Sequence, residues 1–253
     1  MILAVDVGNT VTAVGGFSDR ILFTERLSTD KSATEFEYAM KFRNICELYG
    51  YSPDGIEGAV ISSVVPKVTD AVRLGIKKLG DISIKTVGPG IKTGLSIKID
   101  DPAQLGSDLV TEAVAAVSEY SCPAVVIDSG TAMSISVIDK GRSYIGGVLM
   151  PGIQVSAEAL RKNASQLPQI SFEAPRHVIC SNTIDCLKSG AVYGMASALD
   201  GLIERISEEL CAEPSVIITG FAAETIAKHS KYDMIYDHDL LMKGLMIIYD
   251  KNK

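Results

Sequence analysis

The chain lacks the residue patterns by which most cysteine and histidine sites are recognised. Its five cysteines include no C-x-x-C pair, and its three histidines include no H-x-x-x-H pair. Free thiols in a reducing cytosol therefore explain the cysteines better than a zinc site or a set of disulfides does. We expect a cytoplasmic protein.

The chain also lacks an excess of positive charge. Its formal net charge at pH 7 is −7, and we find no basic stripe along the sequence. Because a nucleic-acid groove needs such a stripe, we expect no nucleic-acid partner. Any polyanion bound by this chain must be small and held locally.

Long apolar runs are missing as well. No run approaches the ~20 residues of a membrane span. The apolar run at the N-terminus is interrupted by Asp6, and no basic segment precedes it, so we expect neither a signal peptide nor a membrane anchor. Hydrophobic residues nevertheless make up 47% of the 253 residues, which excludes disorder and is enough for a sizeable core.

What the sequence does contain is a conspicuous first strand and turn. The apolar run 2–5 continues into Asp6-Val7-Gly8-Asn9-Thr10 and restarts as a second apolar run, 11–17. Because Gly8 and Asn9 tolerate positive φ, the pattern predicts a tight β-hairpin. A hairpin of this kind is usually only a turn, but its backbone N–H groups can also bind phosphate while the carboxylate holds Mg²⁺ through water.

The same pattern occurs a second time near the middle of the chain. An apolar run ends in Asp128-Ser129-Gly130-Thr131, and an alternating strand, 132–139, follows at once. Two related halves with matching hairpins favour two closely packed lobes that clamp a nucleotide. We therefore expect an N-terminal lobe over residues 1–100 and a C-terminal lobe over residues 101–253.

The rest of the chain predicts alternating helices and strands in each half, as two copies of one α/β lobe require. A capping box formed by Thr34 and Glu37 predicts the start of the first helix. Besides the hairpins, the expected strands are 21–27, 58–63, 82–87, 143–149 and 215–219, and the expected helices are 34–49, 66–79, 102–119, 151–163, 183–210 and one ending near 249.

Three segments admit two interpretations each. The glycine-rich loop 88–94 is either a connector or a lid that faces the substrate. Asp108, in Gly106-Ser107-Asp108, is either a helix cap or a functional carboxylate beside a glycine that lets a ligand approach. The small residues in helix 183–210 allow close packing either against a dimer mate or against the sheet.

These motifs, in this order along nearly the whole chain, resemble type III pantothenate kinases of the acetate and sugar kinase/Hsp70/actin superfamily. The fold implied is α/β, with two duplicated actin-like (ribonuclease H-like) lobes and a nucleotide cleft between them. The resemblance rests on 6–10, 62–66, 88–94, 106–108, 128–131, 146–147, 151–153, 167–168, 182–183, 189–190, 194, 200–203 and 219–220.

The resemblance implies an ATP-dependent kinase that phosphorylates pantothenate, works as a homodimer and uses a monovalent cation, K⁺ or NH₄⁺. Asp108 is the implied general base on the pantothenate hydroxyl, and Asp128 the implied cation ligand. A single carboxylate suffices as base in phosphoryl transfer, where positioning and charge neutralisation dominate. The implied ATP contacts are Asp6, Val7, Gly8, Asn9, Thr10, Val11, Thr12, Ala13 and Thr131, and the substrate positions are Ile99, Gly106, Ser107, Asp108, Leu109 and Thr183.

The sequence departs from the family pattern at substrate positions more than at ATP positions. Leu109 stands where the family has an arginine that meets the substrate carboxylate, and Ile99 stands where it has a tyrosine. Loss of a bidentate arginine weakens carboxylate binding unless another cation replaces it. Two alternatives to a pantothenate kinase follow: a kinase of the same fold with a different substrate, and a nucleotide-binding regulator without kinase activity.

Overall fold

The computed structural model describes residues 1–164 and 166–253 and divides into two compact units. The first unit comprises Met1–Leu95, Asp100–Ala115 and Asp239–Lys253, and the second comprises Ser96–Ile99 and Ala116–His238. The expected division was 1–100 and 101–253; in the structure Asp100–Ala115 and Asp239–Lys253 also belong to the first unit, and Ser96–Ile99 belongs to the second.

The first unit is built on a five-stranded sheet with the order β3-β2-β1-β4-β5. β2 runs antiparallel to β1 and β3, whereas β4 runs parallel to β1 and β5. The predicted strands are confirmed within two residues at each end. Their bounds are β1 Ile2–Val7, β2 Val11–Phe17, β3 Ile21–Ser28, β4 Gly58–Ser63 and β5 Ser83–Thr86.

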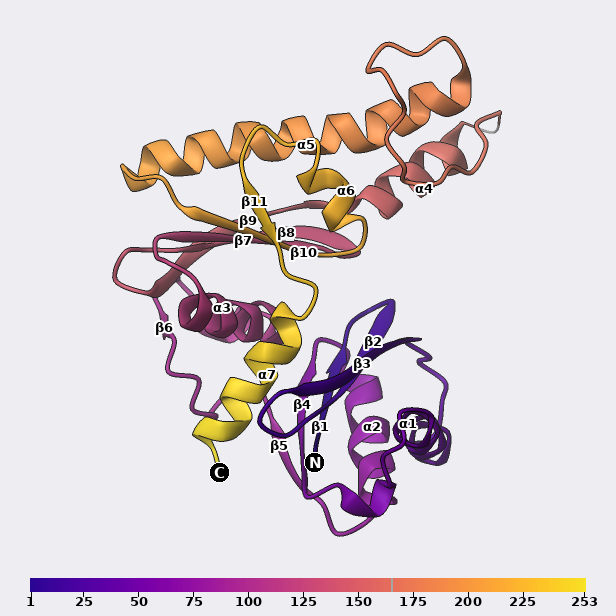
Figure 1. Cartoon of the computed structure of the whole chain (residues 1–253), viewed down its shortest axis with the longest axis vertical. Helices are drawn as coiled ribbons and strands as arrows, with labels where there is room; N and C mark the ends of the chain where they lie inside the picture. Colours follow the sequence, from indigo (N-terminus) through magenta and orange to yellow (C-terminus); the bar gives the residue numbers. More distant parts are fainter. Residues whose placement is uncertain (165) are drawn as a thin grey trace. The chain divides into compact units, whose positions relative to one another are not determined.

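Two neighbouring helices cover one face of this sheet, α1 (Glu35–Leu48) and α2 (Pro66–Lys77) (Figure 1). Tyr38 and Phe42 on α1 are fully buried against the sheet. Burial of each such side chain stabilises the fold by about 1.5–3 kcal/mol. The predicted capping box is confirmed: the Thr34 N–H donates to Glu37 Oε2 (2.7 Å), and the Glu37 N–H donates to Thr34 Oγ1 (3.4 Å).

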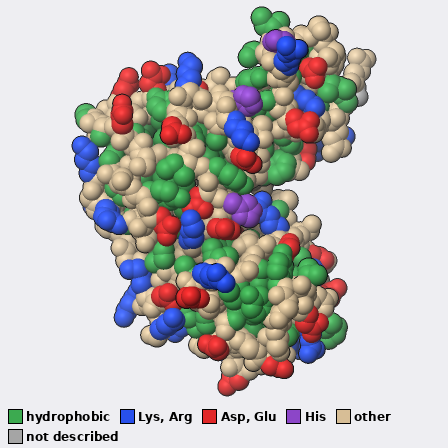
Figure 2. All heavy atoms as spheres, in the orientation of Figure 1, with side chains coloured by type: hydrophobic (Ala, Val, Ile, Leu, Met, Phe, Trp, Pro, Cys, Tyr) green, Lys and Arg blue, Asp and Glu red, His purple; other side chains and the backbone are tan. Residues whose placement is uncertain are grey.

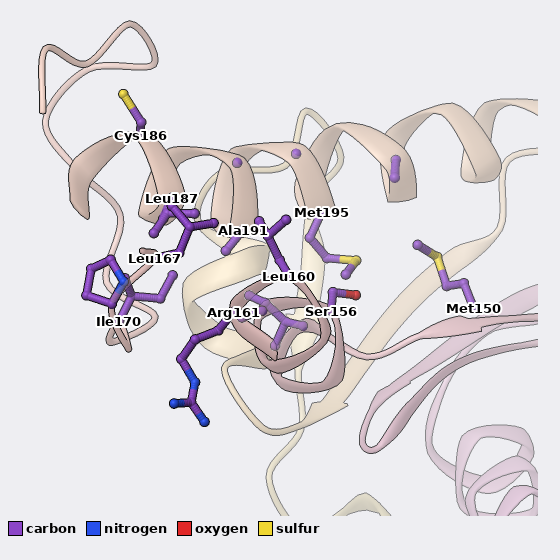
Figure 3. Close-up of a pocket in the computed structure, with 16 residues that line it drawn as sticks. Met150, Ser156, Leu160, Arg161, Leu167, Ile170, Cys186, Leu187, Ala191 and Met195 are labelled. Carbon is purple, nitrogen blue, oxygen red and sulfur yellow. The ribbon is translucent and has the colours of Figure 1, made fainter. Parts of the chain in front are cut away.

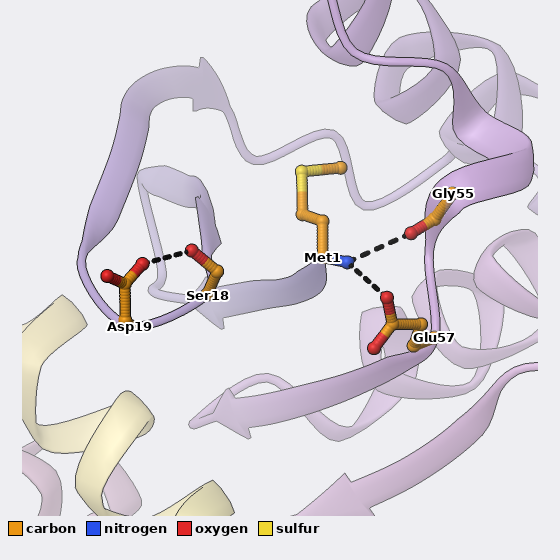
Figure 4. A network of polar contacts seen from close by, with 5 residues as sticks. All are labelled: Met1, Ser18, Asp19, Gly55 and Glu57. Atoms are coloured by element: carbon orange, nitrogen blue, oxygen red, sulfur yellow. Dashed lines mark hydrogen bonds and ion pairs between the residues drawn. The ribbon is translucent and has the colours of Figure 1, made fainter.

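The start of the chain is attached to the loop before β4. The N-terminal ammonium donates to the Gly55 carbonyl, at the end of the short 3₁₀ turn η1 (Pro53–Gly55), and to Glu57 Oε1, both at 3.0 Å (Figure 4). The Glu57 side chain is exposed, so the ion pair itself contributes at most about 1 kcal/mol. The contacts nevertheless hold the first residue in line with β1.

Helix α3 (Ser107–Glu119) begins five residues later than the sequence pattern predicts. Residues Pro102–Gln104 form a separate 3₁₀ turn, η2, in which the Asp101 side chain accepts the Ala103 N–H. Leu105 then has an extended backbone (φ −71°, ψ 124°), which interrupts the helix. The prediction of one continuous helix from Pro102 was therefore wrong.

The C-terminal helix α7 (Leu240–Lys251) belongs to the first unit because it packs on α3 and on the sheet. A Cβ atom on Gly244 would lie 2.0 Å from the Thr111 carbonyl oxygen, so only glycine permits this approach of the two helices. At the other end of α7, a Cβ atom on Gly58 of β4 would lie 2.1 Å from the Tyr249 hydroxyl. Glycines in two distant segments therefore make room for α7.

The second unit repeats the strand arrangement of the first. Its six-stranded sheet has the order β11-β10-β7-β8-β9-β6, in which β9-β8-β7-β10-β11 corresponds to β3-β2-β1-β4-β5 of the first unit. The additional edge strand, β6, pairs in parallel with β9. The bounds are β6 Ser96–Ile97, β7 Ala124–Ser129, β8 Ala132–Ile138, β9 Ser143–Pro151, β10 Ser215–Gly220 and β11 Met234–Tyr236.

The two sheets share even their register. Asp6 is the fifth residue of β1 and pairs with Ser62, the fifth residue of β4. Asp128 is the fifth residue of β7 and pairs with Thr219, the fifth residue of β10. The prediction of two duplicated α/β lobes is therefore confirmed at the level of single residues.

Helix α5 (Thr183–Leu210) runs along the second sheet (Figure 1) and contributes Val192, Leu199 and Ile203 to the core of this unit. Helix α4 (Ile153–Asn163) precedes it and starts after Gly152, not at Pro151, because Pro151 still pairs with β8. The short helix α6 (Ala223–Ala227) and the strands β6 and β11 were not predicted.

On the face shown in Figure 2, Lys and Arg side chains are interspersed with Asp and Glu side chains. Within residues 1–164 and 166–253, no helix combines the length and apolar character that crossing a bilayer requires.

The capping box yields a first prediction. Substitution Thr34→Ala removes the hydroxyl that accepts the Glu37 N–H, and we expect a loss of about 1 kcal/mol in the free energy of unfolding. Urea denaturation of the wild type and the variant measures this difference. No change would show that the box contributes nothing to stability.

Candidate active site

The β1–β2 hairpin presents backbone groups at its tip. The Gly8 N–H donates to the Val11 carbonyl (3.0 Å), and a Cβ atom on Gly8 would lie only 2.9 Å from that oxygen. The side chains of Asn9 and Thr10 are exposed at the tip. The predicted tight hairpin is confirmed, and its tip can be reached by a ligand.

A residue that the sequence analysis missed supports this hairpin from behind. Thr29 Oγ1 donates to the Gly8 carbonyl (2.7 Å) and shares a hydrogen bond with Thr12 Oγ1 (2.9 Å), while the Thr29 N–H donates to the Thr10 carbonyl (2.9 Å). Thr12 and Val7 are fully buried. Their side chains therefore shape the hairpin, and only their backbone can face a ligand.

Asp6 lies at the carboxyl end of β1, beside Ser62 of β4. Both side chains are buried, with 8% exposure for Asp6 and none for Ser62. Neighbouring residues in parallel register project from the same face of a sheet. Ser62 Oγ in turn lies 2.9 Å from Ser107 Oγ, at the first residue of α3. The structure thus joins two predicted site segments, the hairpin and the start of α3, through a serine to which the sequence analysis assigned no role.

Asp108 is half-buried in the first turn of α3. Its Oδ1 accepts the Leu109 N–H at 2.8 Å, and a Cβ atom on Gly106 would lie 2.3 Å from the same oxygen. Burial raises the pKa of the Asp108 carboxyl, partly offset by backbone hydrogen bonds. Gly106 therefore makes room for the carboxylate itself, and Asp108 has the raised proton affinity that suits a general base.

The hairpin of the second unit is surrounded by glycines. A Cβ atom on Gly220 (φ +95°) would lie 2.6 Å from Asp128 Oδ1, and one on Gly152 would lie 2.1 Å from the Gly130 carbonyl oxygen. The Asp128 side chain is half-buried, and Thr131 is exposed at the tip. Because glycine has no side chain, these two positions leave space around the Asp128 carboxylate and the backbone of the turn.

Two other predicted positions lie elsewhere in the second unit. Ile99 follows the edge strand β6 and is half-buried, and Thr183 is the exposed first residue of α5. Asn182 caps this helix, because its Oδ1 accepts the Asp185 N–H at 2.9 Å. The cap leaves the Thr183 side chain at the surface.

The described residues include no group of three or more His, Cys, Asp and Glu side chains that could hold a metal ion. Mg²⁺ seldom needs such a group, because it keeps several waters and binds through one or two carboxylates and the phosphates of a substrate. Asp6, beside the hairpin tip, fits that mode. Asp128 offers the second unit one carboxylate in a glycine-lined turn, which fits a monovalent cation.

An apolar cavity of about 410 Å³ lies between α4, α5 and residues 167–170 of the second unit (Figure 3). Leu160, Leu187 and Met195 point into it, and Gly190 and Gly194 of α5 form part of its wall. The small residues of this helix stand out in the sequence, but no pattern in the sequence predicts the cavity.

Comparison with known proteins decides the family. The family model described as type III pantothenate kinase matches residues 2–205. This chain belongs to the type III pantothenate kinase family. A type III pantothenate kinase of Halalkalibacterium halodurans is 43% identical over 253 residues, which cover all of both chains. One of Bacillus cytotoxicus is 39% identical and covers 100% of this chain and 97% of its own.

Solved structures agree on the fold of this family member. The activator of 2-hydroxyisocaproyl-CoA dehydratase from Clostridium difficile, solved with bound ADPNP, has a TM-score of 0.56 at 12% identity and covers 99% of this chain and 94% of its own. The (R)-2-hydroxyglutaryl-CoA dehydratase component A of Acidaminococcus fermentans has a TM-score of 0.57 at 12% identity, over 100% and 99%. These similarities support the two-lobed actin-like fold.

The raised pKa of Asp108 predicts how stability depends on pH. Burial raises the pKa of the Asp108 carboxyl in the folded state, so the folded protein binds this proton more tightly than the unfolded chain does. The free energy of unfolding therefore decreases as pH rises from the unfolded pKa through the folded pKa of Asp108. Asp108→Asn carries no charge, and its Oδ1 still accepts the Leu109 N–H. We expect a higher melting temperature for Asp108→Asn near neutral pH and a difference that shrinks toward about pH 4. Thermal denaturation at a series of pH values tests this; a variant less stable than the wild type near neutral pH contradicts it.

Proposed function

We infer that this chain is an ATP-dependent kinase that phosphorylates pantothenate to 4′-phosphopantothenate, the first step of coenzyme A biosynthesis. Full-length similarity to proteins named type III pantothenate kinase supports the reaction. Within the molecule, the main support for this reaction is Asp108, a half-buried carboxylate whose pKa is raised by burial. The preceding residue, Ser107, is hydrogen-bonded to Ser62, which lies on the strand beside Asp6.

Residues of the first unit have the following proposed roles in the reaction. Backbone N–H groups at the hairpin tip and the Asn9 and Thr10 side chains bind the ATP phosphates. Asp6 would hold Mg²⁺ through water, and that ion would supply positive charge beside the phosphates. Asp108 accepts the proton of the pantothenate hydroxyl while that oxygen bonds to the γ-phosphorus and the bond to the ADP oxygen breaks.

Three further roles are proposed for residues of the second unit. Thr131 contacts ATP, Asp128 binds K⁺ or NH₄⁺, and Thr183 contacts pantothenate. A monovalent cation held by Asp128 would offset nucleotide charge in a chain that has no P-loop lysine, since G-x-x-x-x-G-K-[ST] is absent from the sequence. All five cysteines are free thiols, in keeping with a cytoplasmic enzyme.

Leu109 supports a second candidate within the same reaction class. A half-buried leucine directly after the base cannot pair with the substrate carboxylate. The alternative is therefore a kinase for an uncharged analogue of pantothenate such as pantetheine.

A coupled assay that measures ADP release tests the activity. We expect turnover with pantothenate that requires Mg²⁺ and is stimulated by K⁺, and a loss of about 10²- to 10⁴-fold in kcat for Asp108→Asn. Asp54→Asn, which changes an aspartate of η1 outside the site, is the matched control and should match the wild type. Turnover with pantetheine but not pantothenate would favour the second candidate, and ATP binding without turnover on either would exclude both.

Homodimer formation is part of the proposal. Gly190 and Gly194 are exposed on α5, and a Cβ atom at either position would meet nothing within 4 Å. Such small residues allow the close approach of another helix, and the apolar cavity beside them offers a surface to cover (Figure 3). A second copy of the chain is the proposed occupant.

Light scattering after size exclusion tests the dimer. We expect twice the chain mass of 26.9 kDa for the wild type and the monomer mass for Gly194→Arg. Glu209→Arg, which places the same side chain at an exposed position near the C-terminal end of α5, should remain dimeric. A dimer that survives Gly194→Arg would place the interface elsewhere.

A further inference from the structure

The Ser107 hydroxyl makes an unusually complete set of contacts with another element. Its Oγ lies 2.9 Å from Ser62 Oγ, 3.0 Å from the Ser63 nitrogen and 3.1 Å from the Ser63 carbonyl oxygen. One arrangement satisfies all three: Ser107 donates to the carbonyl and accepts from the Ser62 hydroxyl and the Ser63 N–H. We call these three residues the serine clasp; it ties the first residue of α3 to the end of β4.

The β4 side of the serine clasp is itself held in place. Ser63 Oγ accepts the Val65 N–H at 3.1 Å and the Thr69 hydroxyl at 2.7 Å, and Thr69 lies on α2. Ser62 is fully buried in the strand next to Asp6. The anchor therefore belongs to the sheet and to the helix that covers it.

The other side of the serine clasp is one residue from Asp108. The Asp108 carboxylate accepts the N–H of the next residue in its own helix, Leu109. This bond orients the carboxylate within the first turn of α3 but does not fix that turn to the sheet. The position of the carboxylate relative to the β1–β2 hairpin thus depends on where the helix begins.

Ser107 differs in this respect from an ordinary cap. A capping hydroxyl bonds N–H groups of its own helix, as Thr34 does for α1. The Ser107 hydroxyl instead bonds to residues 44 and 45 positions away in the sequence. These bonds do not satisfy N–H groups of α3; they fix the position of the start of α3 relative to β4.

We propose that Ser107 is a positioning residue, whose hydroxyl sets the Asp108 carboxylate at the distance from the hairpin that in-line attack on the γ-phosphorus requires. The proposal rests on the kinase function inferred above. It also assigns Ser107 a role other than substrate binding, because the hydrogen-bonding capacity of its hydroxyl is used within the protein.

The test compares Ser107→Ala and Ser107→Thr with the wild type in the ADP-release assay across pH. Since small displacements of a reacting group slow reactions strongly, we expect Ser107→Ala to lower kcat about 10-fold or more with KM for ATP unchanged. As the first turn loosens and water reaches Asp108, the acidic limb of the pH profile should move to lower pH. Ser107→Thr, which keeps the hydroxyl, should have the wild-type kcat and the wild-type position of the acidic limb of the pH profile.

Thr34→Ala is the matched control, since it removes a hydroxyl at the start of another helix in the same unit. It should leave kcat and the pH profile of the folded protein unchanged. If Ser107→Ala behaves like Thr34→Ala in kcat and pH profile, the hydroxyl is merely structural and the proposal is overturned.

A second readout does not depend on activity. Carbon-13 NMR titration of the Asp108 carboxyl should show a lower pKa in Ser107→Ala than in the wild type and no change in Thr34→Ala. An unchanged Asp108 pKa in Ser107→Ala overturns the proposal. A wild-type protein that binds ATP but phosphorylates neither substrate overturns the proposed function alone, because the titration still decides whether Ser107 positions Asp108.

Discussion

The hydrogen bonds between the Ser107 hydroxyl and the end of β4 bring a helix N-terminus to the carboxyl edge of a parallel strand pair. At that edge, β1 and β4 carry Asp6 and Ser62 side by side. The helix adds Asp108, whose burial raises its pKa. Asp6 is buried beside Ser62, whereas Asp108 is half-buried after Ser107, and different environments can assign two carboxylates different roles.

Duplication explains why each unit has such an edge. The aspartates of the two hairpins occupy the same strand position and pair with hydroxyl residues in the same register. The hairpins differ in length, since residues 8–10 connect β1 to β2 and only residues 130–131 connect β7 to β8. The second hairpin is also packed more tightly by glycines, in particular Gly152 and Gly220. One ancestral pattern thus provides two chemically distinct turns.

Local patterns in the sequence predicted the fold well where the deciding interactions are local. The capping box of Thr34 and the Asp-x-Gly hairpins involve residues three or four apart, and both were confirmed. Elements of two to five residues, such as β6, β11 and α6, were missed because they are too short to show a periodic pattern.

Interactions between distant segments account for the other differences. The start of α3 is fixed at Ser107 by bonds to Ser63, 44 residues earlier, which no periodicity can show. Likewise, α7 returns to the first unit because Gly244 lets it touch the Thr111 backbone. Thr29 and Ser62 have roles through hydrogen bonds to other strands and helices, so they became candidates only with the structure.

A crystal structure with pantothenate, Mg²⁺ and a non-hydrolysable ATP analogue is the most direct test of the central claim, that the start of α3 presents the base. The account predicts an Asp108 carboxylate oxygen within hydrogen-bond distance of the pantothenate hydroxyl, with Ser107 still bonded to Ser62 and Ser63. A substrate hydroxyl held by another group, with Asp108 turned away from it, would contradict the account.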